Sequence, residues 1–140
     1  MTVARELGSI TLPAELANLE PLQEHLAAWA AEAGLEPKRI GMLTMALEEI
    51  FVNLCDYAYP DGAGPVWLNC REEGGSFIAD VIDEGPAFDP DSLPEPDLEA
   101  DLEARHVGGL GWFLVRKIAD RLESFRQDGR NIVRLTLHCR

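Results

Sequence analysis

The stretch VIDEGPAFDP, residues 81–90, leaves an apolar segment through Asp83 and places Gly85 two residues later. An acid at the end of a buried strand is partly desolvated, so its carboxylate needs a hydrogen-bond donor. The exocyclic amine of adenine is one such donor, and Gly85 would let a flat ring approach bare backbone. The alternative is a plain turn in which Asp83 bonds to the backbone two residues on. The stretch alone is compatible with both interpretations.

The segments around this stretch predict a single α+β domain that spans residues 1–140. The first strand is expected at residues 5–12, and two more within residues 64–83, joined around Gly74 and Gly75. Residues 124–138 read as a closing hairpin that turns at Asp128 and Gly129. Strands that come in hairpins predict a mixed, mostly antiparallel sheet, and helices on one of its faces would complete a two-layer sandwich.

Three helices are predicted from apolar residues spaced three and four apart. The first would be capped by Asn18 and closed by Gly34, and the second would run from Pro37 to about Tyr59. The third would span residues 109–123 and opens on glycines. The apolar face of the second helix comprises Ile40, Leu43, Leu47, Ile50, Leu54 and Ala58.

The composition restricts the class of protein. With 25 acidic against 12 basic residues, the net charge is −13, which disfavours nucleic acid and anionic membrane partners and favours a basic protein partner. The N-terminus lacks a signal-peptide core and no apolar run reaches the ~18 residues of a membrane span, so we expect a cytoplasmic protein. Three scattered cysteines and three scattered histidines predict neither a zinc site nor a disulfide framework.

A second candidate stretch, EEIFVN, lies in the predicted second helix. Glu49 and Asn53 are four residues apart and therefore share a helix face, whereas Ile50 and Leu54 point to the core. The Asn53 carbonyl oxygen is a hard ligand that suits Mg²⁺, and Glu49 could orient or deprotonate a hydroxyl group. The alternative is an ordinary solvated helix face.

A third stretch, GGLG at residues 108–111, runs directly into a helix, where free backbone N–H groups can bind phosphate. Arg105 and His106 precede it, and the alternative is a flexible hinge. No Lys-Ser/Thr pair follows, so this is not a P-loop. The preceding residues 89–103 carry seven acids and no base, which indicates a functional or disordered loop. Calcium binding by Asp89 and Asp91 is disfavoured, because the ligand spacing of an EF-hand is missing.

Taken in order, these three stretches resemble the motifs of the anti-sigma factor serine/threonine kinases, within the GHKL ATP-binding superfamily. ALEEIFVNLCDYAYP is similar to the N box, VIDEGPAFDP to the first glycine box and GGLGWFLVRKIAD to the second. The resemblance covers nearly the whole chain and implies the Bergerat ATP-binding fold. Two departures concern the pocket: Tyr57 stands where the family often has histidine, and Trp112 is bulkier than usual.

The resemblance also implies roles for individual residues. Glu49 would be the catalytic base and Asn53 the Mg²⁺ ligand, with an ATP lid at about residues 91–107. The implied ATP contacts are Asn53, Asp83, Gly85, Ala87, Phe88, Arg105, Gly108, Gly109, Leu110 and Gly111.

The implied activity is transfer of the ATP γ-phosphoryl group to a serine of a small anti-anti-sigma protein. The protein would also sequester a sigma factor and form a homodimer. The alternative is a regulatory module that binds nucleotide and partner but transfers nothing, which the acidic lid with few bases favours.

Overall fold

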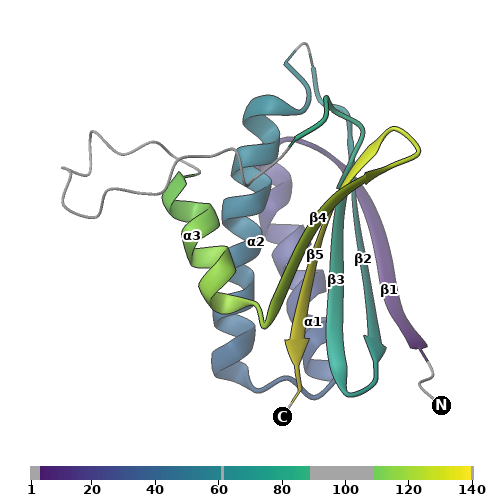
Figure 1. Cartoon of the computed structure of the whole chain (residues 1–140), viewed down its shortest axis with the longest axis vertical. Coiled ribbons are helices and arrows are strands. Elements are labelled where there is room, and N and C mark those ends of the chain that lie inside the picture. Colours follow the sequence, from purple (N-terminus) through teal and green to yellow (C-terminus); the bar gives the residue numbers. More distant parts are fainter. Residues whose placement is uncertain (1–3, 61, 89–108, 140) are drawn as a thin grey trace.

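In a computed structural model of the chain, the described residues are 4–60, 62–88 and 109–139, with only the backbone described for residues 109–111 (Figure 1). A single 3₁₀ turn, η1, precedes the first helix. The elements are, in order, β1 (Ala4–Pro13), η1 (Leu16–Asn18), α1 (Leu19–Glu32), α2 (Pro37–Tyr57), β2 (Pro65–Glu73), β3 (Ser76–Asp83), α3 (Gly109–Ile118), β4 (Arg121–Gln127) and β5 (Arg130–His138).

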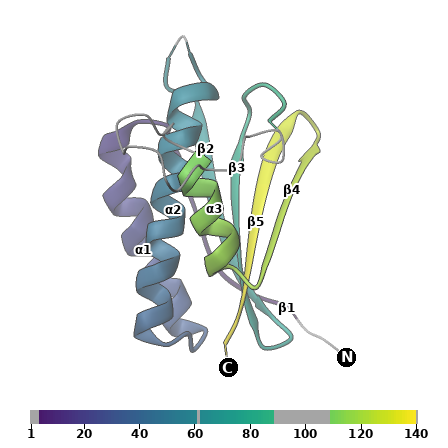
Figure 2. The ribbon, with the colours of Figure 1, turned by 60° about the vertical axis from the view of Figure 1, so that its left-hand side comes forward.

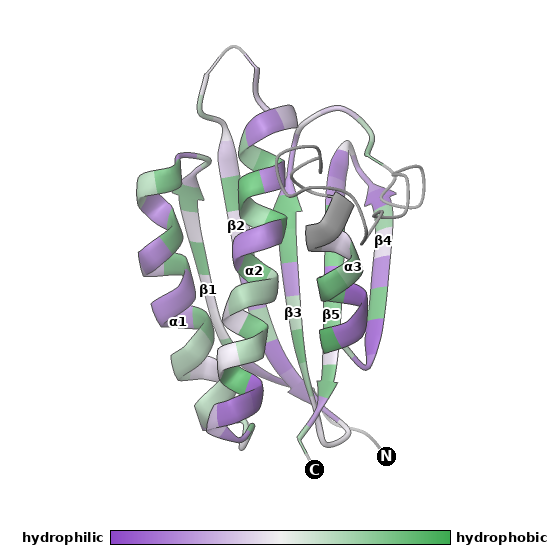
Figure 3. Ribbon diagram, turned by 90° about the vertical axis from the view of Figure 1, so that its left-hand side faces the viewer, coloured by the Kyte–Doolittle hydropathy of each residue, from purple (hydrophilic) through white to green (hydrophobic). Residues whose placement is uncertain are grey.

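The strands form one five-stranded sheet in the order β1-β2-β3-β5-β4. Every strand pairing in it is antiparallel, so the described part of the sheet has no parallel neighbours. All three helices lie on the same face, with α2 between α1 and α3 (Figure 3). The predicted α+β two-layer architecture is therefore confirmed.

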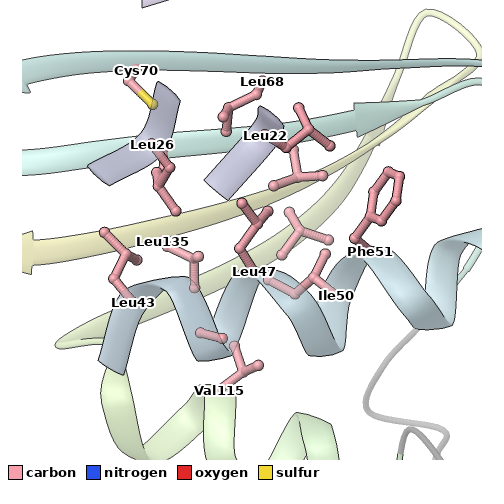
Figure 4. Packing of buried hydrophobic residues seen from close by; sticks show 14 of the residues in the cluster. Leu22, Leu26, Leu43, Leu47, Ile50, Phe51, Leu68, Cys70, Val115 and Leu135 are labelled. Carbon is pink, nitrogen blue, oxygen red and sulfur yellow. The ribbon is translucent and has the colours of Figure 1, made fainter. Parts of the chain in front are cut away.

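The core lies between the helices and one face of the sheet. Alternate residues of each strand point to this face, because side chains alternate across a strand. The residues that β3 and β5 contribute are Phe77, Ala79, Val81, Val133, Leu135 and Leu137. The apolar face of α2 meets them in the predicted register, and Figure 4 shows Leu43, Leu47 and Ile50 directed at the strands. One helix face thus supplies the centre of the hydrophobic core.

The opposite face of the sheet carries no helix, yet its isoleucines are covered. Ile78, Ile82 and Ile132 are each no more than 9% exposed. The guanidinium group of Arg134 lies 5.1 Å from the Phe125 ring centroid and also bonds to Asp80 at 2.7 Å. Long side chains that carry a charge at the tip can cover apolar surface while the charge stays hydrated or paired. On this face the Arg134 side chain thus lies over Phe125 while its charge is paired with Asp80.

The predicted end of the third helix is wrong. Residues 109–123 were expected to be helical, but α3 ends at Ile118 and β4 begins at Arg121. The Asp120 backbone N–H donates to Thr136 O at 3.0 Å, and the Asp120 carboxylate accepts hydrogen bonds from Arg39 and from the His138 backbone N–H. These long-range bonds direct residues 121–123 into the sheet, which no local periodicity reveals.

The helix boundaries at Asn18 and Gly34 are placed as predicted, with one difference. Asn18 occupies the N-cap position of α1, but its side chain makes no capping bond and its Nδ2 donates to Pro13 O at 2.8 Å. Gly34 has a φ of +94°, the left-handed conformation that commonly follows a helix end. The Asn18 side chain thus fixes the approach to the helix rather than its first turn.

The described residues contain neither a membrane-spanning helix nor a cluster of metal-binding side chains. Within residues 4–60, 62–88 and 109–139, no helix is both long and apolar enough to cross a membrane. Over the same residues, no group of three or more His, Cys, Asp or Glu side chains is arranged to hold a metal ion.

The close contact between β1 and α1 gives a stability prediction. A Cβ atom at Gly8 would overlap the indole ring of Trp29, whereas one at Gly41 in α2 would have no neighbour within 4 Å. We expect Gly8→Ala to lower the free energy of unfolding by about 1–3 kcal/mol through overpacking. The matched control Gly41→Ala should raise it by about 0.5–1 kcal/mol, because alanine is the better helix former. Urea unfolding measures both, and equal effects would contradict this packing.

Candidate functional site

The elements that carry the three candidate stretches come together towards one end of the molecule. There α2 ends, β3 ends and α3 begins, as Figure 1 and the rotated view in Figure 2 both show. Three aromatic rings connect these elements. Tyr57 of α2 stacks on Phe88 at 4.3 Å between ring centroids, and Phe88 contacts Trp112 of α3 at 5.8 Å. The fold therefore brings together residues that are far apart in the sequence.

Asp83 ends β3 as predicted and is only 1% exposed. Its Oδ1 accepts two hydrogen bonds, from the Gly85 backbone N–H at 2.8 Å and from Asn131 Nδ2 at 2.9 Å. The bond from the Gly85 N–H is the one expected for a turn in which Asp83 bonds to the backbone two residues on. This turn, one of the two interpretations of the sequence, is therefore confirmed. Among the described residues, none donates to Oδ2, so both hydrogen bonds of this carboxylate are made by Oδ1.

The surroundings of Asp83 have opposing effects on its ionisation. Burial raises the pKa of the Asp83 carboxyl above its ordinary value of 3.8. The hydrogen bonds from Asn131 and Gly85 and the positive charge of Arg126 lower this pKa, but they do not cancel the effect of burial. The ionised carboxylate is thus incompletely stabilised, and a further donor at Oδ2 would stabilise it.

Gly85 has a packing role in addition to any contact with a ligand. A Cβ atom at this position would lie 2.7 Å from the Cα and O atoms of Ala58, at the C-terminal end of α2. Backbone atoms at that distance cannot move aside cheaply, so the turn after β3 needs glycine to sit against the helix. Beyond it, Ala87 is exposed and Phe88 is half-buried in the aromatic stack. The packing of this turn therefore ties Asp83 to the end of α2.

Glu49 and Asn53 lie one turn apart near the C-terminal end of α2, and both are half-exposed. Burial, and to a smaller extent the charge of Glu48, raises the pKa of the Glu49 carboxyl above its ordinary value. This shift brings Glu49 towards the range in which a carboxylate serves as a proton acceptor.

The amide nitrogen of Asn53 is buried and has no hydrogen-bond acceptor. Buried polar atoms without a partner are rare in native proteins, so this side chain fits a ligand that brings its own oxygen atoms. The side-chain oxygen of Asn53 is also a hard donor of the kind that Mg²⁺ prefers, with the other positions filled by phosphate and water. The residues present therefore fit a metal–nucleotide complex. The Trp112 indole N–H, on α3, is a second buried donor without an acceptor.

Several predicted ATP contacts lie outside the described residues. These contacts are Arg105 and Gly108. The predicted lid at residues 91–107 also lies outside the described residues, as do Asp89 and Asp91, the candidates for calcium binding. Gly109, Leu110 and Gly111 form the start of α3, where only the backbone is described. The predicted helix start at the glycines is therefore confirmed, and the ligand contacts there stay predictions.

Sequence reasoning missed two residues that contact the turn after β3. Asn131 of β5 is 3% exposed and bonds to Asp83, and Arg126 of β4 donates to Gly85 O at 3.0 Å. A signal was present for Asn131, because strand alternation places it on the same face as Val133. An amide on a core-facing position needs partners, which marks it as part of a polar site. Arg126 left no such signal.

Comparison with known proteins identifies relatives of this arrangement. Residues 12–137 match the histidine kinase-like ATPase domain family. The serine/threonine-protein kinase BtrW of Bordetella bronchiseptica is 30% identical over 97 residues, which is 69% of this chain and 68% of that protein. The serine-protein kinase RsbW of Halalkalibacterium halodurans is 26% identical over 128 residues, 89% of this chain and 78% of that protein.

Solved structures with the same fold are more distant in sequence. The RsbU and RsbW domains of a Mycobacterium tuberculosis protein superpose with a TM-score of 0.64 at 17% identity, covering 94% of this chain and 32% of that one. The histidine kinase domain of a blue-light activated kinase from Erythrobacter litoralis has a TM-score of 0.53 at 18% identity, with 83% and 60% covered. Both similarities concern the fold alone.

Burial of the Asp83 carboxylate predicts that this residue stabilises the folded protein less as the pH rises. Because its pKa is raised in the folded state, the folded protein holds this proton more tightly than the unfolded chain. The contribution of Asp83 to the free energy of unfolding therefore decreases as pH rises from about 3.8 through the raised pKa. We expect Asp83→Asn to melt at a higher temperature than wild type at pH 7, with the difference shrinking towards pH 4.

Thermal unfolding between pH 4 and pH 7 measures this effect. The exposed neighbour Glu84 supplies the control variant Glu84→Gln, for which little change in stability is expected at any pH. An Asp83→Asn variant that is less stable than wild type at pH 7 would contradict the assigned cost of burial.

Proposed function

The chain belongs to the histidine kinase-like ATPase domain family, and on this premise we propose that it is an ATP-dependent protein serine kinase and anti-sigma factor. It transfers the γ-phosphoryl group of ATP to a serine of a small anti-anti-sigma protein and sequesters a sigma factor. The observation that carries the proposal is Asp83 at the end of β3, whose buried carboxylate has one oxygen that no described residue bonds to. The names of the relatives, which are serine-protein kinases, support the reaction type.

Recognition of adenine is assigned to Asp83. Its Oδ2 accepts a hydrogen bond from the exocyclic amine, and the low exposure of the carboxylate strengthens that bond. Guanine carries a carbonyl oxygen at the corresponding ring position, which would face the carboxylate without a proton between them. This chemistry gives specificity for adenine nucleotides over guanine nucleotides.

The phosphate end of the nucleotide is assigned to α2 and α3. The Asn53 side-chain oxygen would hold Mg²⁺, which when bound neutralises charge on the phosphate oxygens. The first backbone N–H groups of α3, from Gly109 onwards, have no partners within the helix and suit phosphate oxygens. The predicted contacts at Arg105 and Gly108 would add to this end of the site.

Proton transfer is assigned to Glu49. As the serine oxygen bonds to the γ-phosphorus and the bond to the β,γ-bridging oxygen breaks, the Glu49 carboxylate accepts the hydroxyl proton and ADP departs. The transition state of such transfers is largely loose, so positioning and charge neutralisation supply most of the rate enhancement. The raised pKa of Glu49 makes it a better proton acceptor than an ordinary surface carboxylate.

The partners follow from charge and from the relatives. A net charge of −13 favours a basic sigma factor as partner and speeds encounter with it at low salt. The relatives named RsbW are serine-protein kinases, which supports a serine-bearing protein as the substrate. A homodimer and a cytoplasmic location are part of the same proposal.

The adenine assignment predicts the effect of Asp83→Asn on binding. The loss of a charge-assisted hydrogen bond costs about 1.5–3 kcal/mol, which is roughly a ten- to hundredfold loss of ATP affinity. Isothermal titration of ATP and GTP into both proteins measures the effect, and wild type should prefer ATP. Unchanged ATP affinity in the variant would remove Asp83 from the site.

The base assignment predicts a separation of binding from transfer. Glu49→Gln should bind ATP with Mg²⁺ as wild type does, because Glu49 contacts the hydroxyl and not the nucleotide. Its rate of phosphoryl transfer to the substrate serine should fall by about a hundredfold or more. The exposed Glu24 of α1 provides the control variant Glu24→Gln, which should retain activity.

Transfer of labelled phosphate to the anti-anti-sigma protein distinguishes this proposal from the regulatory alternative. If wild type binds ATP and its partner but never transfers phosphate, the protein is a nucleotide-dependent binding module. Retention of full activity by Glu49→Gln would instead reassign the base.

A further inference from the structure

Asn131 lies directly opposite Asp83 in the pairing of β3 with β5, on the core-facing side of the sheet. Its Nδ2 is 2.9 Å from Asp83 Oδ1, 2.7 Å from Pro86 O and 3.4 Å from Gly85 O. A side-chain amide nitrogen has two protons, and the two short bonds use both. The donor side of Asn131 is therefore fully occupied by the turn at residues 83–88.

The acceptor side of Asn131 is occupied as well. Its Oδ1 accepts from the Phe88 backbone N–H at 3.2 Å and from Arg126 Nη1 at 3.0 Å. Arg126 Nη1 also donates to Gly85 O at 3.0 Å, and its Nη2 lies 3.4 Å from Gly129 O. An amide oxygen has two lone pairs, and both are in use. Asn131 thus has no capacity left for contact with a nucleotide.

We propose that Asn131 and Arg126 form a clamp that orients the adenine-binding carboxylate. Asn131 bonds to Asp83 Oδ1, and Arg126 holds Asn131 and the Gly85 carbonyl in place, so that only Oδ2 faces the ligand. This inference rests on the proposed function, because it assumes that Asp83 binds adenine. Asn131 is a positioning residue and not a catalytic one, since it acts through Asp83. The clamp determines which carboxylate oxygen recognises the base and keeps the side chain from rotating.

The burial and chemistry of the clamp argue against a role in stability alone. Asn131 is 3% exposed and occupies a core-facing strand position that Val133 and Leu135 fill with apolar side chains further along β5. An amide there must satisfy every donor and acceptor to avoid a desolvation penalty. It does so entirely with the turn that carries Asp83 and with Arg126.

The other titratable groups that face Asp83 do not obscure a test by pH. Tyr57 and Tyr59 interact with the Asp83 charge, but the pKa of each is raised by burial, so both stay neutral near pH 7. Among the residues that the structure describes, Arg126 on β4 is the charged group that acts on Asp83. Changes in ATP affinity between pH 6 and pH 8 that differ between variants therefore report on Asp83 and its clamp.

The decisive variant is Asn131→Asp, which keeps an acceptor for Phe88 and Arg126 but loses the donor to Asp83. At pH 8 two adjacent carboxylates would repel, and ATP affinity should fall by about tenfold or more. Towards pH 6 the pair should take up one proton, which bridges the two groups and restores the donor. The quantity to compare is the ratio of wild-type to variant ATP affinity, because the titration of ATP itself affects both proteins equally. This ratio should be severalfold smaller at pH 6 than at pH 8.

Three further variants serve as controls and as a second test. Gln127→Glu makes the same amide-to-acid change on an exposed position of β4 and should leave the ratio near one at both pH values. Arg126→Gln is expected to fold, because Arg126 is exposed, and should weaken ATP binding severalfold. Arg121→Gln changes another exposed arginine of β4 and should bind ATP with the affinity of wild type.

The outcomes separate this inference from the proposed function. If wild type fails to bind ATP in calorimetry, the adenine assignment and the clamp both fall. If wild type binds ATP but Asn131→Asp matches Gln127→Glu, or loses affinity equally at pH 6 and pH 8, the clamp alone is overturned. If Asn131→Asp does not fold, Arg126→Gln with wild-type affinity overturns it.

Discussion

The burial of one face of α2 against the sheet is the constraint on which the rest of the molecule depends. Leu43, Leu47 and Ile50 fix the rotation of this helix about its axis. That rotation determines where Glu49 and Asn53 lie, because residues four apart share a face. The end of the helix then meets the turn after β3 at Ala58, where only glycine fits. Core packing and site geometry are therefore decided by the same helix.

The proposed site combines groups that are each held at some cost to stability. The Asp83 carboxylate is desolvated, and the buried nitrogens of Asn53 and Trp112 lack acceptors. Such groups persist when they contribute to function, since their unmet interactions become available to a ligand. The network around Asn131 is the opposite case, because every polar atom is matched. A rigid, satisfied network thus supports an unsatisfied binding group.

The fold does not by itself determine the reaction. Structures that superpose on this chain include an RsbW-type domain and a histidine kinase domain, so one sheet-and-helix arrangement is shared by proteins of different kinds. The chemistry depends on local features, here an acid on α2 with a raised pKa beside an asparagine with an unpaired amide. The assignment as a serine kinase therefore depends on Glu49 more than on the architecture.

Local patterns in the chain were enough to predict the α+β class, the apolar face of α2 and the hairpin at Asp128 and Gly129, because periodicity and turn chemistry are local properties. It also identified Asp83 as a buried acid. Three contacts became visible only in the folded chain: Asp120 leads into the sheet, Gly85 packs on Ala58 and Asn131 bonds to Asp83. These contacts join residues between 16 and 48 positions apart, as in Asp120 to Thr136 and Asn131 to Asp83, and no local pattern encodes such pairings.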